Sequence, residues 1–251
     1  VLRARTYDRN GPLQVFDADK VAGGALRVHR AKGGEAFSAL DDKDYTLAEG
    51  MTVISDADGV ESLGGIMGGV HSGCTDETVN VFLEGAYFDP VRTAYTGRAL
   101  KINSDARYRF ERGIDASWTP VGIEAATQMI LDLCGGIASE VVIAGAQPDH
   151  ARAFQLDTDR IQSLVGMELP DAEQRATLTA LGFDLQGDMV HVPGWRPDIL
   201  GSLLYTSDAA DQPPPGPLRG DRTTNTNTSL TLRPQRIIKI TEKALQITQT
   251  S

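Results

Sequence analysis

The feature that most constrains the fold is a series of short β-type runs separated by turn residues. Between Ala25 and Leu83, β-branched, aromatic and aliphatic residues gather at 26–28, 45–47, 51–55 and 79–83. Residues that favour tight turns lie between these runs, namely Gly33-Gly34, Asp41-Asp42 and the segment 56–59. Short runs with turns this close together are typical of hairpins. The first half of the chain is therefore predicted to be rich in β structure.

Two helices are predicted after these strands. The first runs from Asp89 to about Leu100, with Asp89 as N-cap and Pro90 at the first helical position. The second runs from about Thr119 to Cys134 and ends at Gly135-Gly136. Its apolar residues at helical spacing are Val121, Ala125, Met129, Ile130 and Leu133. Residues 141–144 then read as a closing strand.

A second, smaller unit is predicted beyond residues 147–150, whose composition suits a domain boundary. We expect a helix after Asp157 and another at 171–181, where Asp171 and Gln174 have capping-box spacing. Residues 183–185 and 189–192 are expected to pair as a hairpin. Two helices followed by a hairpin resemble a winged-helix arrangement, which alone does not predict DNA binding.

The sequence thus predicts an α+β protein with two domains and a tail. A mixed, β-rich domain with packed helices covers residues 1–147, and a small, truncated, winged-helix-like α+β domain covers residues 148–200. Residues 201–251 are rich in Pro, Thr and Asn without a core-forming pattern, so we expect a non-native, disordered or artefactual tail. A first residue of Val, not Met, indicates a fragment of a longer product.

Charge and composition restrict the function classes. The chain carries a net charge of −10, and because the segment after Gly201 holds six basic and four acidic residues, residues 1–201 carry −12. Such a surface attracts phosphates poorly, which counts against a freestanding nucleic-acid binder. Apolar runs are too short for a membrane span and no secretory leader is seen, so we expect a cytoplasmic protein. Cys74 and Cys134 lack C-x-x-C spacing, which supports neither a zinc ribbon nor a disulfide framework.

Four sets of residues suggest chemistry, and each also has a simpler structural explanation. The segment 64–69, Gly-Gly-Ile-Met-Gly-Gly, is not followed by the Lys that a phosphate loop needs, so close backbone packing is the simpler reading. Glu84 lies inside an apolar run, and its carboxylate could point into the protein and form an ion pair with an arginine. The arginines at 107, 109 and 112 could pair with neighbouring acids. His71 with Cys74 gives little support to a thiol–imidazole pair or, with Cys134, to a metal site.

In order and spacing, the segments 12–20, 64–73 and 101–115 resemble the editing domain in the β subunit of bacterial phenylalanine–tRNA ligase. The resemblance covers residues 6–200. It implies that this chain is an internal fragment carrying the site that hydrolyses mischarged Tyr-tRNA(Phe), with at most weak hydrolase activity alone. An alternative that stays open is a tRNA-contacting scaffold domain without catalytic activity.

The resemblance also implies roles for individual residues. Gly68 and Ala106 make room for the substrate ring, and Glu84 faces the tyrosine hydroxyl. Ser104 and Gln14 flank the ester and a water. Gln14 departs from the family pattern, which has histidine there, and an amide cannot act as a general base near neutral pH.

The whole enzyme, by the same resemblance, uses ATP and Mg²⁺ and pairs with an α subunit in a heterotetramer that binds tRNA(Phe). Asp198 in Trp-Arg-Pro-Asp matches the first ligand of a magnesium-associated segment. The acidic helix that carries the other ligands in the family is replaced here, so no complete cofactor site is expected in this chain. Neither membrane nor DNA is an expected partner.

Overall fold

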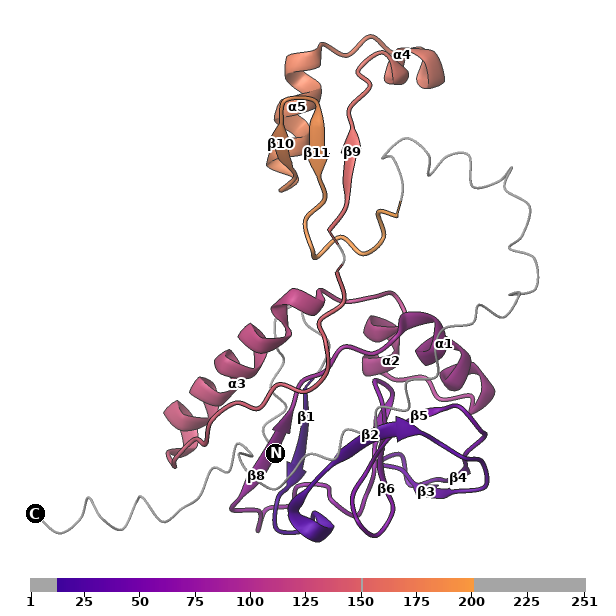
Figure 1. Ribbon diagram of the computed structural model, residues 1–251, viewed down its shortest axis with the longest axis vertical. Helices are drawn as coiled ribbons and strands as arrows, with labels where there is room; N and C mark the ends of the chain where they lie inside the picture. The colour runs from indigo at the N-terminus through magenta and orange to yellow at the C-terminus, as the bar shows by residue number, and fades with distance from the viewer. Residues whose placement is uncertain (1–12, 150, 201–251) are drawn as a thin grey trace, which may run out of the picture. The chain divides into compact units, whose positions relative to one another are not determined.

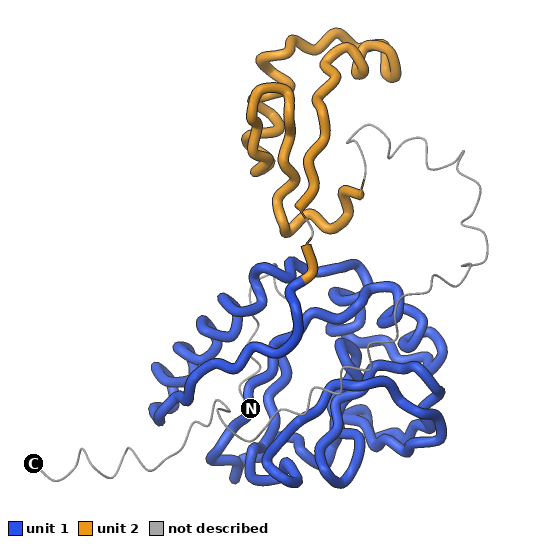
Figure 2. Tube along the Cα trace, in the orientation of Figure 1, with its two compact units in different colours: residues 1–147, 229–251 blue, residues 148–228 orange. Residues whose placement is uncertain are grey.

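The computed structural model describes residues 13–149 and 151–200. They fall into two compact units, residues 13–147 and 148–200, which are coloured separately in Figure 2. Each unit combines helices with antiparallel sheets, which confirms the predicted α+β class. Within these described ranges, no helix is long and apolar enough to cross a membrane.

The first unit is built from short antiparallel strands with helices packed beside them (Figure 1). Its strands are β1 Gln14–Asp17, β2 Arg27–Arg30, β3 Ala36–Ser38, β4 Asp44–Thr46, β5 Thr52–Ser55, β6 Val60–Leu63, β7 Met67–Gly68 and β8 Val81–Glu84. Its helices are η1 Ala22–Gly24, α1 Pro90–Ala99, α2 Asp105–Phe110, η2 Ala116–Trp118 and α3 Thr119–Cys134. The strands pair as a four-stranded sheet in the order β2-β5-β6-β7 and as two ribbons, β1-β8 and β3-β4.

Turn chemistry explains the hairpins. The β5–β6 turn forms around Asp56, whose carboxylate accepts hydrogen bonds from the backbone N–H of Asp58 and Gly59 at 2.8 and 3.0 Å. This side chain-to-backbone pattern stabilises a turn locally, as the sequence predicted. Gly33-Gly34 is different: both residues have positive φ, but the strands around them pair elsewhere, β2 with β5 and β3 with β4.

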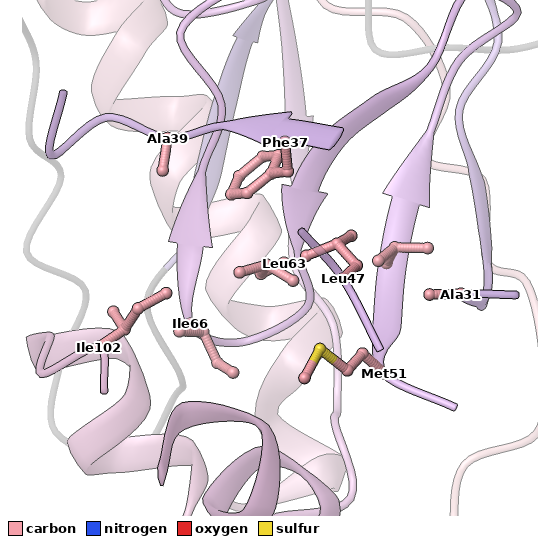
Figure 3. Packing of buried hydrophobic residues seen from close by; sticks show 9 residues of the cluster. Ala31, Phe37, Ala39, Leu47, Met51, Leu63, Ile66 and Ile102 are labelled. Atoms are coloured by element: carbon pink, nitrogen blue, oxygen red, sulfur yellow. The ribbon is translucent and has the colours of Figure 1, made fainter. Parts of the chain in front are cut away.

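The main core of the first unit lies between the four-stranded sheet and the β3-β4 ribbon (Figure 3). Phe37, Leu47 and Leu63 are almost completely buried in it, and Ile102, just before α2, completes one side. The burial of apolar side chains on neighbouring strands therefore holds the two layers together.

A second core cluster packs aromatic rings against glycine backbone. Phe88 and Phe110 meet edge to face with ring centroids 5.2 Å apart, and both rings lie against Gly65. Gly65 has φ +71°, so a residue with a side chain would be strained there as well as crowded. The close packing predicted for the segment 64–69 is therefore present.

The two predicted helices of the first unit are confirmed at their ends. The Asp89 carboxylate accepts a hydrogen bond from Arg92 N at 2.8 Å and caps α1, and α3 ends at Gly135 with φ +71°. The apolar stripe of α3 agrees with the predicted one only at Ile130, which packs toward Leu83 of β8 together with Ile123 and Ala126. Three of the predicted residues are more than 40% exposed, namely Val121, Met129 and Leu133.

The second unit consists of a small sheet with two helices. Its elements are β9 Ala153–Gln155, α4 Arg160–Val165, α5 Asp171–Ala180, β10 Asp184–Gln186 and β11 Met189–His191. The predicted hairpin is present as β10-β11, and β9, which the sequence did not predict, adds to its edge in the order β10-β11-β9. Phe183, Val190, Val192 and Ile199 form its buried core.

Three sequence expectations need comment. No strand forms at 141–144, because that segment finds no pairing partner among the described residues. The capping box at α5 is also absent: Pro170 is the N-cap, and the Gln174 amide instead donates to the carbonyls of Thr158 and Leu169. The predicted tail, residues 201–251, lies outside the described residues.

We expect Gly64→Ala to destabilise the first unit. A Cβ at Gly64 would lie 2.7 Å from Cε1 of Phe88, whose ring is 6% exposed and has no room to move. Overpacking of this kind costs about 1–3 kcal/mol, measurable by urea unfolding. Gly59→Ala is the matched control, since nothing lies within 4 Å of its added methyl group. Equal losses in the two variants would contradict the packing argument.

Candidate functional site

The pairing of β1 with β8 brings Gln14 and Glu84 together. The two residues are direct partners in the antiparallel register, although 70 positions separate them in the sequence. Side chains of directly opposite residues emerge on the same face of a sheet, with Cβ atoms about 4.5–5.5 Å apart. An amide and a carboxyl group therefore share one face of this ribbon.

Gly68 lies against the side chain of Gln14. A Cβ built at Gly68 would be 2.5 Å from Nε2 of Gln14 and 3.1 Å from its Cδ. Since φ of Gly68 is not in the positive region, the absence of a side chain here provides space, not conformational freedom. Three of the predicted site residues, Gln14, Gly68 and Glu84, are thus linked by strand register and direct contact.

Burial raises the pKa of the Glu84 carboxyl from its ordinary value of 4.5 to about 8. The side chain keeps part of its surface accessible. No hydrogen bond or ion pair holds the carboxyl group among residues 13–149 and 151–200, so the arginine partner of the structural reading is absent there. Glu84 is consequently a mostly protonated carboxyl group at neutral pH, with its hydrogen-bonding capacity unused.

Ser104 has a structural role that the sequence did not specify. Its hydroxyl accepts a hydrogen bond from Arg107 N at 3.1 Å, which caps α2, and donates one to the carbonyl of Ile66 at 2.6 Å. These bonds tie the start of α2 to the segment just before Gly68. Ala106, two residues on, is partly buried against the aromatic cluster. The hydroxyl proton of Ser104 is therefore already used in the hydrogen bond to Ile66.

The arginine-rich segment is held by pairing within itself. Arg107 forms an ion pair with Glu111 at 2.9 Å and donates to the carbonyl of Ile102 at 2.6 Å. Arg112 pairs with the other oxygen of Glu111 at 3.1 Å and stacks 3.6 Å from the ring centre of Tyr108. For Arg107 and Arg112 the structural reading is confirmed.

His71 pairs with an acid that sequence reasoning missed. Its Nδ1 lies 3.0 Å from Oε1 of Glu61, which is buried in β6. Cys74 is directed elsewhere, with Sγ 3.7 Å from the carbonyl oxygen of Val15, and burial raises the pKa of its thiol. A thiolate–imidazole pair is thus not formed. The available signal was Glu61 itself, a charged residue inside a buried β run.

Asp198 belongs to the second unit and is held by one arginine. Its two carboxylate oxygens accept hydrogen bonds from Nε and Nη2 of Arg196 at 3.0 and 2.9 Å, which lowers the pKa of the carboxyl group. In the part of the chain that the structure describes, no group of three or more His, Cys, Asp or Glu includes Asp198. By itself this residue does not fit a magnesium site.

Family models match both units. The B3/4 domain model matches residues 5–135, and the tRNA synthetase B5 domain model matches residues 154–203. The first match includes Gln14, Gly68, Glu84, Ser104 and Ala106, and the second includes Asp198.

Curated relatives carry the same name. The chain is 67% identical over 205 residues to the phenylalanine–tRNA ligase β subunit of Ruegeria pomeroyi, covering 82% of this chain and 26% of that protein. The corresponding subunit of Cereibacter sphaeroides is 61% identical, with 82% and 25% covered. The chain therefore spans about a quarter of the length of these relatives. A solved N-terminal fragment of the phenylalanyl-tRNA synthetase β-subunit from Pyrococcus horikoshii aligns at 19% identity over 77% of this chain and 57% of that one, with a TM-score of 0.35.

The raised pKa of Glu84 predicts a pH-dependent stability. Between pH 4.5 and about 8 the folded protein keeps a proton that the unfolded chain releases, so the free energy of unfolding falls as pH rises through this window. Glu84→Gln cannot ionise and should exceed the wild type in stability by a few kcal/mol at pH 8 and by little at pH 4, since a tenfold change in protonation is worth about 1.4 kcal/mol.

Urea unfolding of both proteins from pH 4 to 8.5 measures this difference. The exposed Glu77 provides the matched control, because Glu77→Gln should leave the pH dependence of the wild type intact. A gap between wild type and Glu84→Gln that stays constant with pH would show that Glu84 is an ordinary carboxylate.

Proposed function

Since the chain belongs to the B3/4 domain family and is a homologue of phenylalanine–tRNA ligase β subunits, we propose that its first unit hydrolyses the ester of mischarged Tyr-tRNA(Phe). The observation that carries this proposal is the grouping of Gln14 and Gly68 beside Glu84, whose carboxyl group has no partner among residues 13–149 and 151–200. The name of the relatives, phenylalanine–tRNA ligase β subunit, supports an aminoacyl-tRNA as the substrate class, and the geometry offers chemical groups that suit it.

Glu84 recognises the tyrosine hydroxyl. A pocket for phenylalanine cannot strongly reject an isostere that adds a hydroxyl, whereas a site that hydrogen-bonds this hydroxyl discriminates strongly against the analogue without it. The Glu84 carboxyl, with a pKa of about 8, has a carbonyl oxygen that accepts the phenol O–H even when protonated. Above pH 8 the carboxylate makes a stronger, charge-assisted hydrogen bond.

Gly68 and Gln14 act together beside the substrate. The bare backbone at Gly68 leaves room for the Gln14 side chain that lies against it, and the small side chain of Ala106 leaves room for the ring. The Gln14 amide orients the attacking water. Its carbonyl oxygen accepts a hydrogen bond from the water, but the amide cannot take the proton as the water attacks the ester carbonyl. The bond to the 3′ oxygen of the tRNA then breaks, and that oxygen receives the water's proton through solvent, which leaves a free hydroxyl on the tRNA and free tyrosine. Ser104 positions α2 beside Gly68 through its bond to Ile66.

We propose the activity of the whole enzyme on the same premise. The enzyme charges tRNA(Phe) with phenylalanine in the cytoplasm, and it uses ATP and Mg²⁺ at an active site in the α subunit. The β subunit completes a heterotetramer. Asp198 would contribute to a magnesium-associated segment only with ligands from outside the described residues, since within them no group of three or more His, Cys, Asp or Glu includes it.

A second candidate function is a tRNA-contacting scaffold without hydrolysis. Two observations favour it: Gln14 replaces the histidine expected at this position, and the Ser104 hydroxyl proton is engaged by Ile66. Deacylation of Tyr-tRNA(Phe) distinguishes the two functions. The suitable host is a chimera in which this chain replaces the matching 205-residue segment of the Ruegeria pomeroyi β subunit.

Glu84→Ala in this chimera should slow Tyr-tRNA(Phe) hydrolysis about 10- to 150-fold, which corresponds to the loss of a hydrogen bond worth about 1.5–3 kcal/mol. Phenylalanine charging should not change, because that reaction is proposed for another subunit. Glu84→Gln should retain more activity than Glu84→Ala, since the amide oxygen still accepts a hydrogen bond from the phenol O–H. Glu77→Ala serves as the exposed control. Hydrolysis that only follows the folded fraction of each variant would leave Glu84 with a structural role alone.

Gln14→His should increase hydrolysis. Imidazole can accept the proton that the glutamine amide cannot, and general-base assistance contributes about 10²–10⁴-fold, so even partial recovery is measurable. The rate should also acquire a dependence on pH near the ordinary pKa of histidine when followed from pH 6 to 8. Equal rates and equal pH profiles for the unsubstituted chimera and Gln14→His would remove this position from the chemistry.

A further inference from the structure

Three potential metal ligands converge at one end of the four-stranded sheet. Asp56 begins the β5–β6 turn, Glu61 lies in β6, and His71 lies in the loop after β7. One ligand atom from each residue lies within 4.8 Å of the others. His71 and Glu61 are closest, with Nδ1 to Oε1 at 3.0 Å.

We propose that Asp56, Glu61 and His71 bind a divalent transition-metal ion of the Zn²⁺ type. One imidazole nitrogen and two carboxylate oxygens form a mixed ligand set that suits this ion, with donor atoms about 2.0–2.2 Å from the metal. Ligand atoms at such distances from one centre lie roughly 3–3.5 Å apart. The pair His71 and Glu61 already has this spacing, at 3.0 Å, and the Asp56 oxygen, within 4.8 Å of both, would have to move closer. Three protein ligands leave a further position for water.

Backbone amides already orient both carboxylates. The Asp56 carboxylate accepts from Ala22 N at 2.8 Å on one oxygen and from Asp58 N and Gly59 N on the other. Oε2 of Glu61 accepts from Ser72 N at 3.1 Å, which directs Oε1 toward His71. Outer hydrogen bonds of this kind fix ligand orientation in metal sites, and each carboxylate keeps lone pairs for an ion.

Charge and burial favour a cation at this position. Glu61 is 3% exposed and has a second carboxylate, Asp56, nearby, an arrangement that costs free energy unless positive charge offsets it. His71 is 62% exposed along its side chain, so a cation can reach the cluster from solvent. Ser72, the residue after His71, also has a fully buried hydroxyl without a hydrogen-bond partner among the described residues, while its backbone N holds Glu61.

The proposed ion would brace the segments that carry Gly68 and Gln14. Gly69 N donates to the carbonyl of Glu61 at 2.7 Å, and Asp17 N, at the end of β1, donates to the carbonyl of Ser72 at 2.8 Å. Metal binding here therefore stabilises the fold around the candidate site without supplying a reacting group. The competing explanation is a metal-free Glu61–His71 ion pair that stabilises the same loop.

Calorimetric titration of the metal-stripped 251-residue chain with Zn²⁺ tests the proposal. We expect one ion per chain, and a loss of affinity of about 100-fold or more in Glu61→Gln and in His71→Gln, since removing a ligand costs at least as much as removing an outer partner. His29→Gln is the matched control, because His29 also lies in the first unit but bonds to Ser55 and the carbonyl of Arg30 instead. Zn²⁺ should raise the thermal midpoint of the wild type and of the control only.

Co²⁺ as a spectroscopic probe separates this site from the two cysteines. Nitrogen and oxygen ligation gives d–d bands without the near-ultraviolet charge-transfer bands that Cys74 or Cys134 would produce. If Glu61→Gln fails to fold, the His71→Gln variant alone tests the proposal, because the exposed His71 side chain can be replaced without disturbing a core. No Zn²⁺ binding by the wild type, unchanged affinity in His71→Gln, or thiolate bands with Co²⁺ would each overturn the proposal.

Discussion

The antiparallel pairing of β1 with β8 is the interaction on which the candidate site depends. It joins residues 14–17 to residues 81–84 and so closes a long stretch of chain that contains the four-stranded sheet. Without this pairing, Gln14 and Glu84 would have no fixed relation, and α3, which packs toward Leu83 of β8, would lose its support. A few backbone hydrogen bonds and the buried side chains of Phe16 and Leu83 thus position the chemistry.

Close approach of backbone to side chains provides the second constraint. The glycines at 64, 65 and 68 have no space for a Cβ, since the rings of Phe88 and Phe110 and the amide of Gln14 lie directly against them. The absence of side chains allows close packing at Gly64 and Gly65 and leaves space for the Gln14 amide at Gly68. Glycine at these positions therefore suits both the stability of the fold and the candidate site, so one short motif has a structural and a functional interpretation.

Glu84 combines a stability cost with a proposed function. Burial raises its pKa to about 8, so the fold tolerates the group mainly as a neutral acid. A carboxyl group without a partner loses less as a neutral acid than as an ion, and a ligand hydroxyl can satisfy it when it binds. The proposed selectivity for a hydroxylated ring and the reduced stability expected at alkaline pH would then be two consequences of one desolvated side chain.

The sequence by itself determined the α+β class, the helices α1 and α3 with their caps and the hairpin β10-β11, because turn residues and helix caps act over short distances. The residues of the candidate site came from the resemblance of three ordered segments to a family, and their roles stay predictions. Only the tertiary structure decided which strands pair, which face of α3 is buried, and that residues 141–144 form no strand, since these depend on contacts between distant segments. The sequence also did not predict that His71 pairs with Glu61 and not with Cys74, or that the Ser104 hydroxyl donates a hydrogen bond to the carbonyl of Ile66. Local patterns specify chemical groups, whereas the register between distant strands decides which groups meet.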